Sequence, residues 1–523
     1  VHMSRGLGDV YKRQPLGIQT FEKIIEEDFL YIDKTQEIYR LIKKAGYYFY
    51  ARPRRFGKSL LLSTIKAVYE GKKDLFQGLW IADKWNWAKV LPVIHIGFSS
   101  IAHKTLGLEK AIQQVLNNIA YQHDIVFRAS DYVSKFKELI ATLAAQKGKV
   151  VLLIDEYDKP IIDYLGKEIA QAELNQSILK AFYSVIKDSD PYIEFMMITG
   201  ISKFSKVSIF SELNNITDIT FHRRYMQLTG ITQRELEANF AEEIEELAAE
   251  NDSTPSELMA KIRHWYNGYS WNAKTFVYNP YSLLSYFDFG EFRNFWFETG
   301  TPTFLLHLME KQQIIKIDAL EVDSSVFSSY NIKSLQAIPI LFQTGYLTIK
   351  KNLQHDLYLV DYPNSEVRDS MMRSLIGKLR YDENAFSKPM IIQISRALQQ
   401  KKLEHLIRLI KSIFKNIPNQ IFKPKSEYYY HSLIYLVFFY LGEQIESEIN
   451  TNDGRLDAVI KTKDYIYVLE FKLDESGEIA LEQIKTKGYA EKYYADKREK
   501  VLLGINFNSD LKTVDSWKCE ILE

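Results

Sequence analysis

Apolar runs alternate with helical patterns along the first part of the chain. Four short apolar segments, each four to eight residues long, predict buried strands: 47–51, 91–98, 150–154 and 193–199. Stretches with apolar residues at helical spacing lie between or beside them, at about 36–44, 108–125, 132–146 and 169–187. Strands that alternate with helices predict an α/β fold, in which helices cover both faces of a parallel sheet.

A Gly-Lys-Ser sequence joins the first apolar segment, 47–51, to a helix that starts near Leu60. In a P-loop, backbone N–H groups and the positive end of the helix dipole hold phosphate oxygens. Lysine adds a positive charge, and the Ser hydroxyl binds Mg²⁺. The sequence therefore predicts that Gly57, Lys58 and Ser59 bind the phosphates of a nucleotide such as ATP, with Ser59 on the metal.

The first half of this motif departs from the P-loop pattern. Arg52 stands where G-x-x-x-x-G-K-[ST] has its first glycine. Pro53 removes one N–H donor and favours an extended conformation for Arg52. Arg54 and Arg55 are candidates to supply positive charge to the phosphates in place of the missing backbone groups.

The third apolar segment, 150–154, ends in two acidic residues. This is a Walker B arrangement, in which Asp155 holds Mg²⁺ through water and Glu156 polarises the attacking water. A buried strand that merely ends in acids is the alternative. Its position after a strand, Gly-Lys-Ser and helix favours the Walker B interpretation, since phosphate sites lie at such strand ends.

Two further groups of polar residues leave alternatives open. Thr199 and Ser202 follow the last strand, where a γ-phosphate sensor belongs, although a helix N-cap uses the same residue types. The sequence His222-Arg223-Arg224 offers an arginine for phosphate, but most surface arginine pairs have no such role.

The middle of the chain is predicted to be helical. Helix starts are expected at Thr232 and at Ser253-Thr254-Pro255, and a helix over 335–347 precedes a hairpin made by 346–349 and 357–360. Helices combined with a hairpin suggest a winged-helix-like lid.

A second set of chemical groups lies near the C-terminus. If Lys463-Asp464 form a two-residue hairpin turn, Thr462 pairs with Tyr465, and Asp457 then faces Glu470 directly, about 5 Å away. Lys472 projects from the same face as Glu470. Two carboxylates that share a divalent ion, with an ammonium beside them, suit metal-assisted phosphodiester hydrolysis. A register slip of one residue would separate them.

A solvated Glu–Lys pair on an exposed strand is the alternative for this site. Glu470 and Lys472 interrupt an apolar run, however, where charge is costly without a purpose. Glu427, on a predicted helix, is the candidate third metal ligand, and Glu448 is a second. Gln483 and Lys487 share one face of a helix expected over 478–492.

Composition bounds the class of protein. The chain has 523 residues, 46% of them hydrophobic and 26% charged, with a formal net charge of +0. A chain without net charge has no overall electrostatic field that would attract nucleic acid or membranes, so any basic binding surface must be local. One cysteine, Cys519, excludes an intramolecular disulfide and favours a cytoplasmic location. The longest apolar stretch, 433–441, is too short to span a bilayer.

The length predicts several domains. Residues 1–14 have no secretory pattern and are interpreted as a non-native tail. The expected division assigns 15–230 to the P-loop domain, 231–365 to the lid, 366–415 to a helical connector and 416–523 to the nuclease-like domain.

Five motifs together resemble the AAA-ATPase-like family of bacterial proteins: ARPRRFGKS, VVLLIDEYDKP, TGISKFS, YNGY and FWFETGTP. Its members typically carry a C-terminal PD-(D/E)XK nuclease-superfamily domain, which GRLDAVI, EFK and EQIKTKGY resemble. The resemblance implies an ATP-binding core with nucleotide and Mg²⁺ on Lys58, Ser59, Asp155 and Glu156. For the C-terminal domain it implies a metal site on Asp457, Glu470 and the helical Glu427, with Lys472 as the catalytic lysine and Gln483 as part of the helix motif.

These observations favour an ATP-binding protein in which the nucleotide controls a Mg²⁺-dependent nuclease. DNA is favoured over RNA as the substrate, with no membrane partner. The alternatives are a nucleotide-dependent switch or scaffold whose C-terminal fold only binds nucleic acid, and an ATPase with a structural C-terminal domain. No trans-acting arginine can be named from the sequence, so the oligomeric state stays open.

Overall fold

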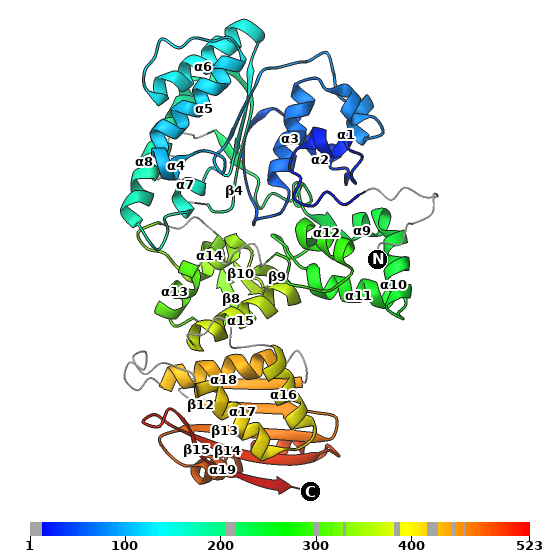
Figure 1. Cartoon of the computed structure of the whole chain (residues 1–523), viewed down its shortest axis with the longest axis vertical. Helices are drawn as coiled ribbons and strands as arrows, with labels where there is room; N and C mark the ends of the chain where they lie inside the picture. The colour runs from blue at the N-terminus through cyan, green and yellow to red at the C-terminus, as the bar shows by residue number, and fades with distance from the viewer. Residues whose placement is uncertain are drawn as a thin grey trace. The chain divides into compact units, whose positions relative to one another are not determined.

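The computed structural model describes residues 13–203, 215–296, 303–314, 316–327, 331–380, 388–415, 427–441, 446–452 and 455–522. Within these ranges, only the backbone is described for 303, 378–380, 388, 415, 427–431, 446–452 and 455–457. The chain forms two compact units, Val1–Arg368 and Asp369–Glu523, each with its own sheet (Figure 1). We refer to them as unit 1 and unit 2.

Unit 1 is built on a five-stranded parallel sheet in the order β2-β3-β4-β1-β5. Its strands are β1 (Gly46–Ala51), β2 (Val93–Gly97), β3 (Val150–Asp155), β4 (Ile193–Gly200) and β5 (Ile216–Asp218). The four predicted strands are confirmed, and β5 is an addition at the edge. Because β4 lies between β1 and β3, the ends of the two motif-bearing strands flank the end of β4.

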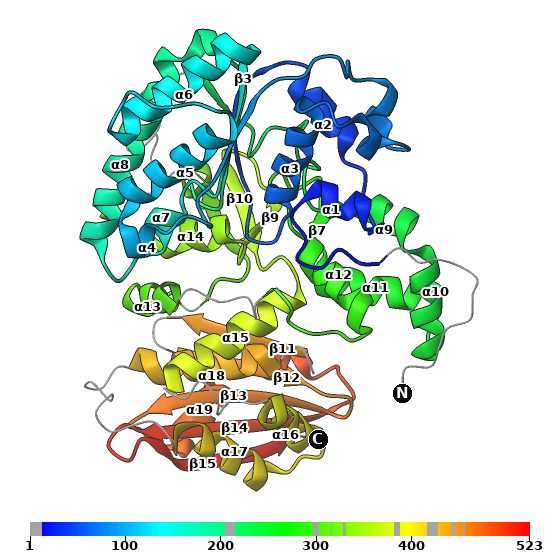
Figure 2. The same ribbon diagram turned by 45° about the horizontal axis from the view of Figure 1, so that its top comes forward.

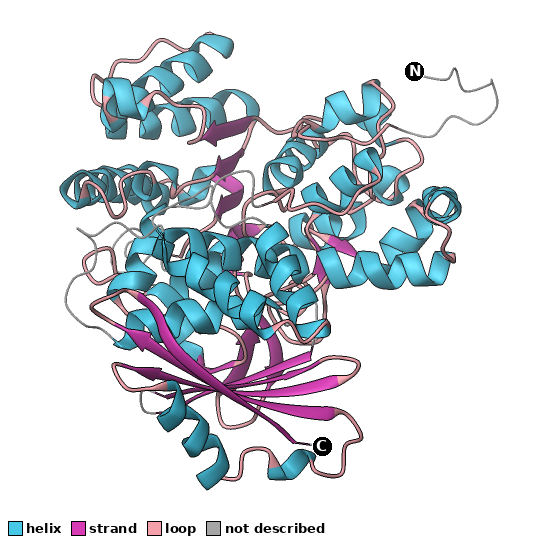
Figure 3. Cartoon of the chain, turned by 60° about the horizontal axis from the view of Figure 1, so that its bottom comes forward, coloured by secondary structure: helices cyan, strands magenta, loops and turns pink. Residues whose placement is uncertain are grey.

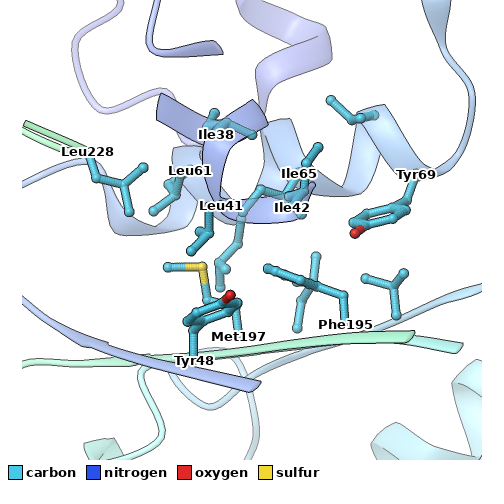
Figure 4. Close-up of a cluster of buried hydrophobic side chains, with 14 of the residues drawn as sticks. Ile38, Leu41, Ile42, Tyr48, Leu61, Ile65, Tyr69, Phe195, Met197 and Leu228 are labelled. Atoms are coloured by element: carbon cyan, nitrogen blue, oxygen red, sulfur yellow. The ribbon is translucent and has the colours of Figure 1, made fainter. Parts of the chain in front are cut away.

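Helices cover both faces of this sheet, as Figures 1 and 2 show. On one side lie α1 (Phe21–Glu26), α2 (Thr35–Ile42) and α3 (Lys58–Tyr69); on the other lie α4 (His103–Leu106), α5 (Leu108–Gln122), α6 (Tyr132–Lys147), α7 (Lys159–Ile162) and α8 (Ile169–Asp188). Alternate strand residues such as Tyr48, Phe195 and Met197 pack under α2 and α3 (Figure 4). The intervening residues Phe49, Met196 and Ile198 are buried too, so both faces of the sheet are covered.

A helical layer follows in unit 1. It contains α9 (Gln233–Asn239), α10 (Ala241–Glu250), α11 (Pro255–Tyr266) and α12 (Pro280–Phe289), with the short strands β6 (Ile231–Thr232) and β7 (Val277–Tyr278). Thr232 and Thr254 each form a capping box with the glutamate three residues later, which confirms both predicted helix starts. These helices enclose a hydrophobic cluster that is separate from that of the sheet.

The remainder of unit 1 contains the predicted helix and hairpin. They are α14 (Ala337–Thr344), β9 (Thr348–Asn352) and β10 (Leu357–Asp361), preceded by α13 (Thr303–Lys311) and β8 (Leu320–Asp323). The strand β8 pairs with β10 and makes a three-stranded sheet that the sequence did not predict. The lid interpretation of this region stays a prediction.

Unit 2 has a mixed sheet in the order β11-β12-β13-β14-β15. Its strands are β11 (Glu446–Asn452), β12 (Arg455–Lys461), β13 (Tyr465–Leu473), β14 (Glu499–Asn508) and β15 (Thr513–Leu522). Its helices are α16 (Lys388–Gln399), α17 (Leu403–Lys415), α18 (Glu427–Leu441) and α19 (Gly477–Thr486), and α15 (Ser365–Arg380) runs from unit 1 into unit 2. The strands, in magenta in Figure 3, have helices on both faces.

Neighbouring residues of β13 show which helix covers which face. Phe471 packs against Phe438 of α18, with ring centroids 5.7 Å apart. Glu470 points the other way and accepts a hydrogen bond from Gln483 of α19. The helix α19 joins the parallel strands β13 and β14, as a crossover connection must.

The predicted helix over 478–492 is wrong in its length. The helix α19 ends at Thr486, and Gly488 adopts a φ of 63°, a left-handed conformation that stops a helix. Residues Glu491–Tyr493 form a separate 3₁₀ turn. None of the described helices is long and apolar enough to cross a lipid bilayer.

Candidate functional site

A cavity of about 520 Å³ lies at the C-terminal end of β1 and the start of α3. Six residues proposed from the sequence to bind nucleotide or catalyse its hydrolysis line it: Arg54, Arg55, Gly57, Lys58, Ser59 and Glu156. The segment Pro15–Gln19 and three residues of α12, Pro280, Tyr281 and Leu284, also line it. The fold therefore gathers most of the predicted P-loop residues around one space.

Lys58 is the buried cation of this cavity. Gly57, with a φ of 81°, allows the turn into α3, whose N-terminus has no side-chain cap. The Lys58 ammonium donates hydrogen bonds of 2.9 Å to the carbonyls of Arg52 and Pro53, and the residue is only 5% exposed. Burial lowers the pKa of Lys58, and nearby Glu156 partly opposes this effect. A buried ammonium beside uncapped N–H groups fits a phosphate group.

Arg52 lies away from the cavity. Its guanidinium stacks 3.7 Å from the ring of Trp271 and 4.4 Å from that of Tyr50, and it donates to the carbonyls of Ala51 and Thr220. The residue is 1% exposed, and burial lowers its pKa. Arg52 therefore anchors the loop against the rest of unit 1, a position in which it cannot replace the backbone cradle of the missing glycine.

The next two arginines contact aromatic residues from α12 and the segment after it. The carbonyl of Arg54 accepts a hydrogen bond of 3.2 Å from the indole of Trp296. Arg55 adopts a left-handed φ of 65°, and its guanidinium lies 4.8 Å from the ring centre of Tyr281 on α12. Arg55 is exposed at the cavity, which leaves it available to a polyanionic ligand.

The two acids at the end of β3 have different surroundings. The Asp155 carboxylate accepts a hydrogen bond of 2.5 Å from the Thr199 hydroxyl and is 6% exposed. Of these two acids, only Glu156 is among the described residues that line the cavity, and its φ of 52° turns the chain sharply after the strand. Thr199 therefore contacts the Walker B position, which is consistent with a sensor at the end of β4.

Asp158 is a buried acid that sequence reasoning missed. Its Oδ2 accepts hydrogen bonds from the backbone N–H groups of Ile201 (2.9 Å) and Ser202 (2.6 Å), and its Oδ1 has no hydrogen-bond partner among the described residues. Burial raises the pKa of Asp158 to about 6. A Cβ on Gly200 would lie 2.6 Å from the Tyr157 ring, so only glycine fits there. The end of β4, at Gly200, is therefore packed closely against Tyr157 and Asp158.

A smaller cavity of about 100 Å³ adjoins the first. The two share Phe56, Gly57, Leu60 and Pro280, among others, and the smaller one continues between Tyr31, Ile32, Leu228 and Ile231. Its lining is mainly apolar, so it suits a flat ring more than a phosphate.

Unit 2 brings together the residues of the second predicted site. Asp457 of β12 pairs directly with Glu470 of β13, and the Thr462 N–H donates to the Tyr465 carbonyl across the turn. The predicted register is therefore confirmed. The side chain of Asp457 lies outside the described residues.

Glu470 is completely buried. It accepts a hydrogen bond from the Gln483 amide, and the Lys472 ammonium lies 3.7 Å from its Oε1. The predicted placement of Glu470 and Lys472 on one face is confirmed. Burying a carboxylate is costly unless it is paired, so this arrangement requires its ammonium and amide partners.

The other proposed ligands are described only in part. Glu427 begins α18 and Glu448 lies on β11, but the side chains of both lie outside the described residues. Among the side chains that the structure does describe, no three of His, Cys, Asp or Glu gather closely enough to hold a metal ion. That set excludes Asp457, so the metal site stays a prediction.

Comparisons with known proteins identify both regions. The family model described as Predicted AAA-ATPase matches residues 15–210, and that of the PD-(D/E)XK nuclease superfamily matches residues 425–517. An uncharacterized protein in the vnfD 5'region of Azotobacter chroococcum mcd 1 is 38% identical over 527 residues, which cover 98% of this chain and 99% of that protein.

Among solved structures, the chain is similar to that of the Aeropyrum pernix ORC2 protein, determined as ADPNP–ADP complexes. The sequence identity is 12% and the TM-score is 0.26, and the match covers 79% of this chain and 85% of that chain. The two family models cover the regions of the chain that hold the two candidate sites, and the relative matches nearly the whole chain. The chain belongs to the AAA-ATPase-like family and carries a C-terminal PD-(D/E)XK nuclease-superfamily domain.

Proposed function

We propose that this protein binds ATP with Mg²⁺ in unit 1 and cleaves nucleic acid with a divalent metal in unit 2, under control of the nucleotide. The observation that carries the proposal is the register of β12 and β13, which sets Asp457 opposite Glu470. The Lys472 ammonium lies 3.7 Å from Glu470. Two acids and a lysine in this arrangement are the groups that metal-assisted phosphodiester hydrolysis needs.

In unit 1 the phosphates would lie over the start of α3. Lys58 would exchange its carbonyl partners for phosphate oxygens, and the Ser59 hydroxyl and Asp155, through water, would hold Mg²⁺. The metal supplies charge neutralisation between the phosphates. Glu156 would orient the attacking water, since it lines the cavity. Arg55 would add charge from the rim.

The nucleotide base would enter the smaller cavity. An apolar space lined by residues such as Ile32, Leu228 and Ile231 adjoins the phosphate end at Gly57 and Leu60. This separation of a charged and an apolar compartment matches the chemistry of a nucleotide, whose phosphates and base lie at opposite ends.

In unit 2, Asp457 and Glu470 would hold the metal, with Glu427 as the third carboxylate. A bound Mg²⁺ or Mn²⁺ supplies an activated water and stabilises charge on the scissile phosphate. Lys472 would stabilise the same charge. Gln483 would fix the orientation of Glu470 through the hydrogen bond that already joins them.

A nucleotide-dependent switch without nuclease activity is the second candidate. The Arg52 side chain, which is buried against Trp271, leaves the loop without its first glycine. A loop that lacks part of this phosphate cradle would bind ATP without hydrolysing it, which suits a switch.

The nucleotide site is tested by equilibrium binding of a fluorescent ATP analogue with Mg²⁺. We expect Lys58→Ala to weaken binding at least about tenfold, because it removes the buried charge from the phosphates. Lys110→Ala, on the exposed face of α5, is the matched control and should bind as wild type does. Equal binding by wild type and Lys58→Ala would contradict the assignment.

A further inference from the structure

A second large hollow on unit 1 is strongly basic. It has a volume of about 840 Å³ and lies between the end of α2 and the loop 223–227. Its lining contains five cationic side chains and one carboxylate, that of Glu37. The cations are Arg40, Lys43, Lys44, Arg223 and Arg224. We call this hollow the basic groove.

Four of these five cations have no acidic partner among the residues that the structure describes. The only ion pair in the basic groove, among the described residues, joins Arg40 to Glu37 at 3.4 Å. Lys43 lies over the ring of Tyr39, 5.3 Å from its centre. Arg223 and Arg224 are exposed. The groove therefore presents uncompensated positive charge to solvent.

The supports of the groove are rigid. Ile38 and Leu41 of α2, and Tyr225 and Leu228 in and just after the loop, belong to one buried hydrophobic cluster. Figure 4 shows Ile38, Leu41 and Leu228 in this cluster. The segments that carry the cations thus cannot separate to relieve repulsion. Gathering like charges in this way destabilises a fold unless a polyanion binds there.

We propose that the basic groove binds the phosphate backbone of nucleic acid. This inference rests on the proposed function, because a nuclease must hold its substrate. The net charge of the chain is +0, so such a concentration of charge is local. Duplex DNA carries one negative charge per about 1.7 Å of its axis, so a groove of this size meets several phosphates at once.

The basic groove is distinct from the cavity of about 520 Å³ at the start of α3, which we call the nucleotide cavity. None of the described residues lines both. Arg223 and Arg224, which the sequence offered as phosphate ligands, lie in the groove and are absent from the described lining of the nucleotide cavity. Substitutions here should therefore leave the binding of ATP unchanged.

The test is fluorescence anisotropy of a labelled DNA duplex with the full chain in EDTA, over a range of salt concentrations. Without a divalent metal there is no cleavage, so binding is read independently of the nuclease. We expect Arg223→Gln/Arg224→Gln to weaken binding roughly tenfold at low salt. The slope of log K against log salt should become shallower by about two.

Two variants serve as controls. Lys110→Gln/Lys180→Gln removes two exposed charges from α5 and α8, outside the groove, and should leave the slope at the wild-type value. Arg223→Lys/Arg224→Lys keeps the charges and should retain most of the affinity. Retained binding of the ATP analogue shows that each variant is folded.

An unchanged slope in Arg223→Gln/Arg224→Gln would overturn the proposal. So would a change in oligomeric state with unchanged DNA affinity, because the groove would then bind an acidic surface of a second copy. A duplex that binds but is never cleaved when Mg²⁺ is restored would leave the groove supported and refute the nuclease.

Discussion

Two buried ionisable side chains line the nucleotide cavity of unit 1. Lys58 is 5% exposed and Asp158 is 1% exposed. Burial lowers the pKa of Lys58 and raises the pKa of Asp158, because it favours the neutral form of each side chain. Asp158 accepts two backbone hydrogen bonds, which stabilise its charged form but do not outweigh desolvation. Burial of these two groups therefore lowers the stability of unit 1 at neutral pH.

The pKa of Asp158 makes stability depend on pH. Its pKa in the folded state, about 6, is higher than its pKa in the unfolded state. At pH values between the two, the folded state binds a proton that the unfolded state has lost. The contribution to stability is fully present below about pH 4 and is lost as pH rises through 6. Asp158 therefore lowers the stability of unit 1 at neutral pH.

We predict that Asp158→Asn stabilises unit 1 at pH 8 and not at pH 4. Asparagine keeps an acceptor for Ile201 and Ser202 without a buried charge. The gain in the free energy of unfolding should be roughly 1–3 kcal/mol. Denaturant unfolding is followed by tryptophan fluorescence, because all tryptophans but Trp517 lie in unit 1.

The exposed Asp188 of α8 provides the control for this measurement. Asp188→Asn should change stability little at either pH. A loss of stability in Asp158→Asn that is equal at both pH values would mean that its hydrogen bonds, and not its charge, decide the energetics.

At the residue scale, the place of a residue in the fold could be predicted from the sequence where a motif marks it. Lys58 and Glu470 could be named because a Gly-Lys-Ser turn and an interrupted apolar strand mark them locally. The anchoring of Arg52 could not be predicted, because its partners Thr220 and Trp271 are far away in the sequence. Asp158 gave no local signal beyond its place after the Walker B acids.

At the scale of elements, the close approach of α19 to β14 positions Gln483 beside Glu470. A Cβ on Gly504 would lie 2.3 Å from the Gly477 carbonyl oxygen and 2.4 Å from the Leu481 nitrogen, both of α19. The same helix carries Gln483, which contacts Glu470. The absence of a side chain at Gly504 thus sets how closely the helix approaches the acids.

We predict that Gly504→Ala displaces α19 and destabilises unit 2 by at least about 1–3 kcal/mol, because backbone atoms cannot move aside as a side chain can. Metal-dependent cleavage should fall with it, as Gln483 moves from Glu470. The fluorescence of Trp517 reports unfolding of this unit, since its backbone also contacts the Gly477 position.

Gly97 of β2 provides a matched glycine in a strand. A Cβ there would meet only the Ser100 hydroxyl, at 3.7 Å, so Gly97→Ala should be tolerated. Wild-type stability and cleavage in Gly504→Ala would show that α19 has room to shift and that its approach does not position the site.

The elements themselves were largely predictable. The register of Asp457 and Glu470 followed from a two-residue turn, since such a turn fixes the pairing of both strands. The end of α19 was misjudged because helical periodicity continues past Gly488, whose backbone conformation stops the helix. The strand β8 was missed because its register is set by distant β10.

At the scale of the whole molecule, the hydrophobic pattern of the sequence could not predict which distant segments come together. The nucleotide cavity needs Pro15–Gln19 and α12 as walls, and the basic groove needs α2 beside the loop 223–227. These contacts depend on how the layers of unit 1 pack, which local periodicity does not specify. The two-unit organisation is the basis for proposing control of one site by the other.

The central claim is that the two units form a nucleotide-controlled nuclease. The most direct measurement incubates supercoiled plasmid, or single-stranded RNA, with the full chain and Mg²⁺ or Mn²⁺, with and without ATP. Wild type, Lys58→Ala and Asp457→Ala are compared side by side. We predict plasmid cleavage that disappears in Asp457→Ala and that responds to ATP only when Lys58 is present. Cleavage that persists in Asp457→Ala would contradict the account. So would the absence of cleavage by wild-type protein that binds ATP, with either metal.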